Sequence, residues 1–151
     1  MPLVNYPGDV DRTIEAVTDP TALSKRAARR LIQRAFVLAG RDRNVRQHIR
    51  EAHCRLLWVI EDWDLAWTVS LYRGKMEFDR RPTKRPDLTL TWPTAEEFFK
   101  QVAVGTRKDD APEHSGEASH WKFGQPVYSS FCAAMREVLR DPVDENGVRL
   151  A

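Results

Sequence analysis

The sequence is poor in cysteine and has no long apolar run, and each of these features argues against one class of protein. Only two of its 151 residues are cysteines, Cys54 and Cys132, which argues against a disulfide framework and fits a reducing compartment. The longest apolar run, Leu56–Ile60, is far shorter than the ~20 residues of a membrane-spanning helix. The first thirty residues contain no signal-peptide pattern. We therefore expect a cytoplasmic protein.

Signatures of catalysis and metal binding are also missing. Gly105, Gly116 and Gly124 are too dispersed for a phosphate-binding loop. His48 and His53 are five residues apart, a spacing that does not align them on one face of a helix, and there is no Cys-x-x-Cys pair. No serine or cysteine stands beside a positioned base. The sequence therefore predicts no catalytic residue, no metal and no cofactor.

Length and composition indicate one folded domain over residues 1–151. A chain of this size buries roughly two-thirds of its unfolded surface, and 42% of the residues are hydrophobic. Charged residues make up 30% of the chain, and the mean hydropathy is -0.55. We expect an N-terminal extension over 1–18, a mobile loop over 106–118 and a frayed tail over 143–151.

Apolar residues at helical spacing predict four helices. The first follows Asp19-Pro20 and stops at Gly40. A capping box at Thr94–Glu97 opens a later helix, which Gly105 closes. The expected helical ranges are 20–39, 44–52, 95–104 and 126–140, the last of which begins at Pro126 and ends at Asp141-Pro142.

Alternating apolar and polar residues predict strands. The clearest case is the segment in which Leu65, Trp67, Val69 and Leu71 share one face. Turns are expected at 63–64 and 73–75. The expected strands are 54–62, 65–73, 76–79, 87–92 and 119–123.

Basic residues recur at intervals of three and four in the first helix. They are Lys25, Arg26, Arg29, Arg30 and Arg34. A contiguous cationic face could contact an anionic membrane surface, and the alternative is an ordinary solvated helix face. Nucleic acid ranks lower, because base-stacking aromatics are needed beside the cations and the aromatics are expected inside.

The chain contains five tryptophans, and three of them, Trp58, Trp67 and Trp92, fall on expected strands. Phenylalanines and Met135 lie on the helices that would cover those strands. Such a set either fills a core or lines a cavity for an apolar ligand. The sequence leaves both interpretations open.

The order of elements resembles that of the sterol carrier protein type 2 family. The best-matching stretch is WVIEDWDLAWTVSLYRGKMEFDRRPTKRPDLTLTWPTAEEFFKQV, residues 58–102, and WKFGQPVYSSFCAAMREVL is similar to the family's last strand, glycine and closing helix. The sequence departs from the family at 106–118, where a polar stretch stands in place of the usual second helix and glycine-containing loop. The resemblance implies an α+β fold, in which helices cover one face of a mixed, mostly antiparallel five-stranded sheet above an apolar tunnel.

The same resemblance implies binding and carrying of a hydrophobic small molecule, such as a lipid, acyl chain or sterol-like metabolite. The expected ligand-binding residues are Trp67, Leu71, Phe98, Phe99, Val102, Phe131 and Met135. The alternative is a small biosynthetic isomerase or cyclase that uses the same pocket, with His120 and His53 transferring protons and Tyr128 donating a hydrogen bond. Convergence of His53, Cys54, His120 and Cys132 on a metal is a further alternative.

Overall fold

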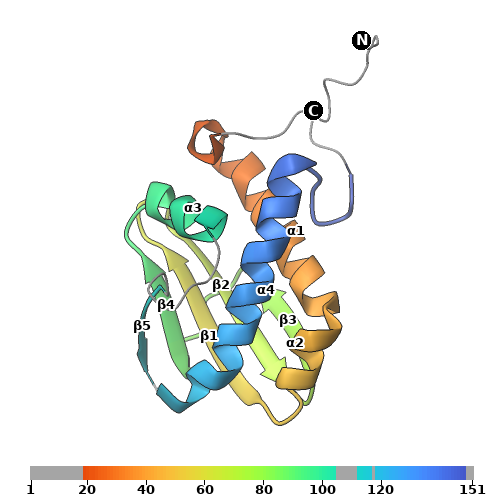
Figure 1. The fold of residues 1–151 in the computed structure, drawn as a ribbon. Coiled ribbons are helices and arrows are strands. Elements are labelled where there is room, and N and C mark those ends of the chain that lie inside the picture. The colour runs from red at the N-terminus through yellow and green to blue at the C-terminus, as the bar shows by residue number, and fades with distance from the viewer. Residues whose placement is uncertain (1–18, 105–111, 117, 149–151) are drawn as a thin grey trace.

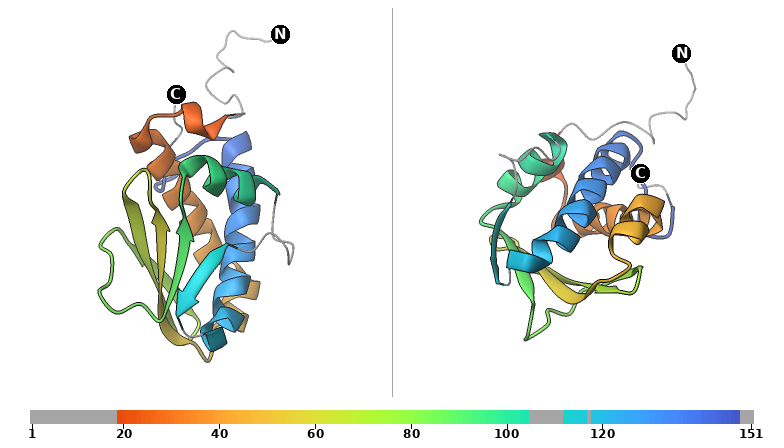
Figure 2. Two further views of the ribbon diagram at one scale, coloured as in Figure 1. Left: turned by 90° about the vertical axis from the view of Figure 1, so that its left-hand side faces the viewer. Right: turned by 60° about the horizontal axis from the view of Figure 1, so that its bottom comes forward.

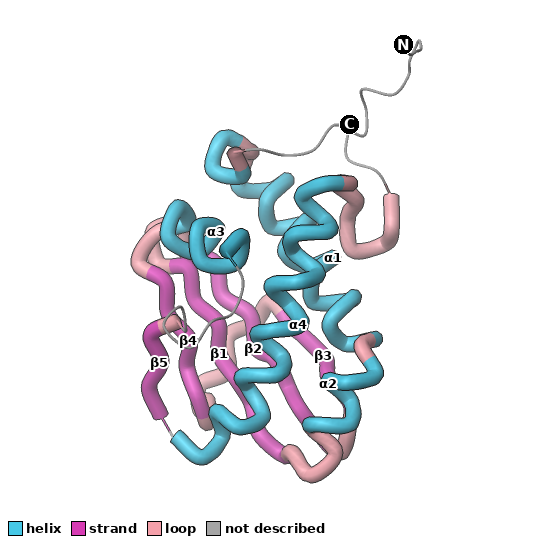
Figure 3. Tube along the Cα trace, viewed as in Figure 1, coloured by secondary structure: helices cyan, strands magenta, loops and turns pink. Residues whose placement is uncertain are grey.

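The computed structural model describes residues 19–104, 112–116 and 118–148. Its helices lie on one side of a five-stranded sheet, so the fold has two layers (Figures 1 and 2). Figure 3 separates the helical layer from the strands. The elements are η3 (Pro20–Ala22), α1 (Lys25–Arg41), α2 (Arg43–His48), β1 (His53–Ile60), β2 (Leu65–Tyr72), β3 (Lys75–Asp79), β4 (Leu88–Trp92), α3 (Ala95–Val104), β5 (Glu113–Gly116), η5 (Ala118–His120) and α4 (Trp121–Arg140).

The sheet has the order β3-β2-β1-β4-β5. β1 and β4 run parallel, and every other neighbouring pair is antiparallel. Along β1 and β2 the side chains facing the helices are buried, as a strand period of two requires. The predicted α+β class and the mixed, mostly antiparallel sheet are confirmed.

Both predicted turns of the β1–β2–β3 meander are confirmed. The first joins β1 to β2 through residues 61–64, where Asp64 has a φ of 52°. The second uses Arg73 and Gly74, with φ of 50° and 89°. Short turns of this kind allow neighbouring strands to pair antiparallel.

The first helix begins and ends later than predicted. Asp19 caps only the short 3-10 helix η3, where its Oδ1 accepts from the Thr21 amide at 3.2 Å. The α-helix begins after Ser24, whose Oγ accepts from the Ala27 amide at 3.1 Å. Gly40 does not stop the helix but lies inside it, where a Cβ would come within 3.5 Å of the Met76 carbonyl oxygen. A side chain there would make an ordinary van der Waals contact with β3, so α1 lies directly beside this strand.

The end of the chain departs most from the sequence-based expectation. The predicted strand 119–123 is wrong, because residues 118–120 form a 3-10 helix and α4 already begins at Trp121. The true last strand, β5, lies inside the segment expected to be a mobile loop. The expected helix stop at Gly105 lies outside the described residues.

Two residues that usually interrupt helices explain that error. A Cβ on Gly124 would meet Trp121 Cε3 at 3.2 Å and Leu88 Cδ2 at 3.4 Å, so the glycine lets α4 approach β4 closely. Pro126 also lies inside α4, where it removes one backbone donor and its ring crowds the carbonyl of the preceding turn. Both residues are therefore accommodated within one helix of 20 residues.

Part of the expected frayed tail is ordered. Asp144 is only 2% exposed, and its Oδ1 accepts from the amides of Asn146 at 2.9 Å and Val148 at 2.8 Å. Its Oδ2 bonds Arg30 on α1 at 3.1 Å. These contacts hold residues 144–148 against the helical layer.

Candidate ligand site between sheet and helices

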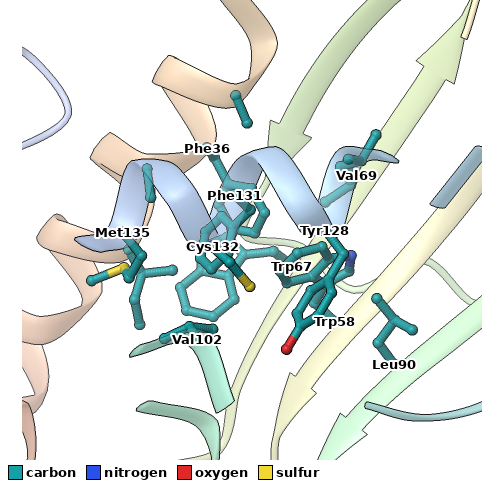
Figure 4. Close-up of a cluster of buried hydrophobic side chains, with 14 of the residues drawn as sticks. Phe36, Trp58, Trp67, Val69, Leu90, Val102, Tyr128, Phe131, Cys132 and Met135 are labelled. Carbon is teal, nitrogen blue, oxygen red and sulfur yellow. The ribbon is translucent and has the colours of Figure 1, made fainter. Parts of the chain in front are cut away.

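A layer of aromatic rings fills the space between the sheet and the helices. Trp58 lies at its centre, with ring centroids 4.8 Å from Phe131, 5.0 Å from Phe36 and 5.5 Å from Trp92. Tyr128 on α4 lies 5.8 Å from the same indole. Figure 4 shows Phe36, Trp58, Tyr128 and Phe131 converging from α1, α4 and the sheet. The site is therefore built on the central strand and the two longest helices.

All seven expected ligand-binding residues lie in the interior. Phe98 on α3 contacts Phe99 at 5.0 Å and Phe131 at 6.0 Å between ring centroids, and Trp67 joins the layer through Phe36 at 5.7 Å. Leu71 lies four residues further along β2, about 13 Å from Trp67 at the usual rise of a strand. No member of the set is more than 3% exposed: Trp67, Leu71, Phe98, Phe99, Val102, Phe131 and Met135.

Sequence reasoning gave Phe36 and Trp58 no ligand role, and it named Tyr128 only as the hydrogen-bond donor of the enzyme alternative. Phe36 belongs to the apolar stripe of the first helix, and Trp58 alternates with buried neighbours on β1. Both signals place a side chain inside. Neither signal says which interior side chains touch, because those contacts join elements far apart in the sequence.

The polar atoms of the three interior tryptophans differ in their partners. Trp92 Nε1 donates to Gln101 Oε1 at 2.8 Å, and Trp67 Nε1 donates to Gln33 Oε1 at 3.3 Å. Trp58 Nε1 is buried and has no hydrogen-bond partner in the described part of the chain. A buried donor of this kind is uncommon and calls for an explanation.

The groups that an enzyme or metal site would need are not brought together. His53 packs its ring edge-on against Tyr72 at 4.8 Å, on the face of the sheet away from the helices, whereas His120 belongs to η5 on the helical side. Among residues 19–104, 112–116 and 118–148 no cluster of three metal-ligating side chains occurs. Burial raises the pKa of the Cys54 thiol to about 11 and that of the Cys132 thiol to about 12. Both thiols are therefore protonated near neutral pH.

One of the five basic residues predicted to form a cationic face on α1 is neutralised by the C-terminal tail. Arg30 forms ion pairs with Asp144 at 3.1 Å and Glu145 at 3.7 Å. Burial and the nearby Arg80 lower the pKa of Arg29. Contact between this helix and an anionic membrane stays a prediction. Arg30 no longer belongs to the proposed contact residues, because it is ion-paired within the protein. None of the described helices is both long enough and apolar enough to cross a bilayer.

The tail contact makes a testable prediction about pH. Backbone hydrogen bonds from Val148 and Asn146, together with the charges of Arg30 and Arg34, lower the pKa of Asp144. A carboxyl whose folded-state pKa lies below its unfolded value of about 4 stabilises the fold above that value. This stabilisation is lost as the pH falls through the folded-state pKa.

We therefore expect Asp144→Asn to lower the free energy of unfolding at pH 7 and to make no difference at the acid end of the range. Urea denaturation of both proteins between pH 7 and pH 2.5 measures this convergence. A difference that stayed constant over the whole range would contradict the role assigned to the charge.

Two hollows lined by described residues lie outside the aromatic layer. One, of about 360 Å³, lies between the start of α2 and the middle of α4, where Ser130 Oγ donates to Asp42 Oδ2 at 2.7 Å. The other, of about 540 Å³, lies at the end of the sheet near His53 and Tyr72. Of the seven expected ligand-binding residues, only Leu71 lines either hollow.

Comparisons with known proteins bear on the fold. No family model matches the chain, and no curated protein matches it. Among solved structures, a conserved hypothetical protein of Thermus thermophilus, described as a possible sterol carrier protein, is 9% identical with a TM-score of 0.53 and covers 86% of this chain and 98% of its own. The chain therefore has a fold like that of sterol carrier protein type 2.

Two further solved structures are less similar. The UbiJ-SCP2 ubiquinone synthesis protein is 13% identical, covers 78% of this chain and 93% of its own, and has a TM-score of 0.42. The stereoselective inverting sec-alkylsulfatase Pisa1 from Pseudomonas sp. is 17% identical, with a TM-score of 0.42 and coverage of 56% of this chain. This chain spans only 14% of the sulfatase.

Proposed function

We propose that the protein binds and carries a hydrophobic small molecule, such as a lipid, acyl chain or sterol-like metabolite, between its sheet and its helices. The observation that carries this proposal is the unpaired Trp58 indole N–H at the centre of the aromatic layer. Leaving such a donor unsatisfied costs about 1–3 kcal/mol. A ligand hydroxyl or carboxylate at Trp58 would satisfy it while the apolar part of the ligand lies among the seven expected residues.

The proposal requires one element of the helical layer to move, because the rings are in contact where the ligand would lie. We assign that movement to α3, the shortest of the helices that cover the aromatic layer. Its attachments near the sheet include the 2.8 Å bond from Trp92 Nε1 to Gln101 Oε1 and the 2.9 Å bond from the Ala95 amide to Asp62 Oδ1. Apolar surface buried by the ligand contributes about 25 cal/mol per Å² before binding costs are subtracted.

We also propose that the protein is cytoplasmic. Both cysteines are free and buried, and free thiols are the normal state of cysteine in a reducing compartment. This arrangement supports the location predicted from the small number of cysteines.

The test uses two fluorescent probes, cis-parinaric acid for acyl chains and dehydroergosterol for sterols, together with native mass spectrometry of the purified protein. We expect at least one probe to bind with 1:1 stoichiometry. The variant Trp58→Phe keeps a ring but removes the N–H. Because a hydrogen bond to a charged group contributes about 1.5–3 kcal/mol, the variant should weaken cis-parinaric acid binding by about tenfold or more.

The control is Trp63→Phe, at a half-buried indole whose centroid lies 6.1 Å from Phe99. It makes the same change of ring outside the centre of the layer and should leave affinity within about twofold of the original protein, the usual range for a change away from the contact. The proposal fails if neither probe binds and no lipid accompanies the protein in the mass spectrum.

A further inference from the structure

Helices cover one face of the sheet only (Figure 2). On the other face, Arg55, Ser70 and Glu77 line the hollow of about 540 Å³. The strand register explains why the surface is concave there. Ser70 on β2 pairs with Arg55 on β1 and with Glu77 on β3, so a small side chain lies between two long ones. Neighbouring strands are only about 4.8 Å apart, and the long side chains therefore form walls around Ser70.

The loop between β3 and β4 forms a third wall and is fixed to the sheet. Thr68 Oγ donates to the Arg81 carbonyl at 2.6 Å and accepts from the Thr83 amide at 2.8 Å. At the other end of the loop, the Arg55 amide donates to Asp87 Oδ2 at 2.8 Å. Arg85, between these anchors, lines the hollow. The Arg85 guanidinium therefore belongs to a loop segment that hydrogen bonds hold to the sheet on both sides.

An exposed aromatic side chain closes the hollow at the end of the strands. Tyr72 is 47% exposed, whereas the tryptophan and phenylalanine rings of the sheet are buried or partly buried. The His53 ring packs against it, and the Arg73 guanidinium lies 5.3 Å from its ring centroid. The sequence analysis ranked nucleic acid low because aromatics were expected inside, and Tyr72 is the exception.

The hollow is lined by two guanidiniums, Arg55 and Arg85, and two carboxylates, Glu77 and Asp87. Arg55 and Arg85 have no ion-pair partner in the described part of the chain. Of the two carboxylates, Asp87 is engaged by the Arg55 amide, and Glu77 remains as an acceptor. Two guanidiniums beside an exposed ring match a phosphate joined to a planar base, since guanidinium groups bind phosphate oxygens and aromatic rings stack on bases.

We propose that this hollow binds a nucleotide, with its base on Tyr72 and its phosphate at Arg55 and Arg85, while Glu77 accepts from a sugar hydroxyl. The nucleotide can be a free mononucleotide or one unit of a single-stranded RNA. The site lies on the opposite face of the sheet from the aromatic layer. It neither requires nor excludes the carrier function.

The experiment measures binding of AMP by calorimetry and of a 10-nucleotide single-stranded RNA by fluorescence anisotropy, both at 50 mM salt. The variants are Tyr72→Ala and Arg85→Gln, and the matched control is Arg43→Gln, an exposed arginine at the start of α2 on the helical side. Loss of base stacking should raise Kd by about 5- to 100-fold in Tyr72→Ala. Arg85→Gln should raise Kd by about tenfold or more, and Arg43→Gln should leave Kd unchanged.

Binding of AMP that both variants weaken supports a mononucleotide site. Binding of the RNA alone, weakened by the same variants, supports a site for a strand. No binding of either probe overturns the proposal, as does binding that Arg43→Gln weakens as much as Arg85→Gln. Arg85 is exposed on a loop, so Arg85→Gln decides the matter even if Tyr72→Ala unfolds, and its binding of cis-parinaric acid should match that of the original protein.

Discussion

Phe131→Ala is expected to lower the free energy of unfolding by about 3–5 kcal/mol, the usual cost of removing a fully buried aromatic ring. Phe131 is 0% exposed. Its centroid lies 4.7 Å from Phe36 and 4.8 Å from Trp58, so the substitution removes the contact that joins α1, α4 and β1. Because these elements are rigid, the vacated space would not collapse fully. Urea denaturation at neutral pH measures the loss.

Phe123→Ala is the matched control in the same helix. Phe123 is only partly buried, and Lys122 lies over its ring at 5.0 Å from the centroid. Truncation there should cost about 1 kcal/mol, within the ordinary range for point mutations. Equal losses in the two variants would contradict the assignment of Phe131 to the centre of the core.

Gly116→Ala is expected to detach β5 from β4. Gly116 has a φ of 115°, and a Cβ there would lie 2.6 Å from the carbonyl oxygen of Asp87 and 3.1 Å from Leu88 Cα. The backbone strain alone costs about 1–3 kcal/mol, and the contact with backbone atoms cannot be relieved by rotating a side chain. All four residues of β5 are exposed, so little burial offsets the strain.

Hydrogen exchange measures this effect locally. The β4–β5 ladder pairs Leu88 with Gly116 and Thr91 with Glu113, and its amides should lose about 100-fold of protection if about 3 kcal/mol of docking free energy is removed. Gly147→Ala serves as the control, since Gly147 has a φ of 83° with no atom within 4 Å of an added Cβ. It carries strain without the clash. If both variants left the ladder protected, the close approach at Gly116 would be ruled out.

The parts of the fold that sequence predicted correctly are those with a local physical signal. β2 alternates buried and partly exposed residues over most of its length, and the capping box was half confirmed, as the Glu97 amide donates to Thr94 Oγ at 3.1 Å. β5 was missed because Glu113–Gly116 has no apolar face. Its position depends on the contact between Gly116 and Asp87, which lie far apart in the sequence.

The candidate sites show the same division. Periodicity placed the expected ligand-binding residues inside, and each of them is buried. It could not identify Phe36 as the ring that joins Trp67 to Phe131, because that contact depends on how α1 crosses the sheet. Alternation also placed Tyr72 on the face of β2 opposite to Trp67 and Leu71, but it could not identify His53 as the ring that packs against it.

The parallel pairing of β1 with β4 implies that the strands of the sheet pair in a particular order during folding. The β1–β2–β3 meander joins neighbours in the chain, so its loops close at little entropic cost, whereas β4 must return across the meander to reach β1. Contacts between α1 and α4 span most of the chain, and the bond from Arg30 to Asp144 spans 114 residues. On a ribosome the meander would therefore be complete while α4 was still being synthesised, and the first helix would remain without its partner until α4 had emerged.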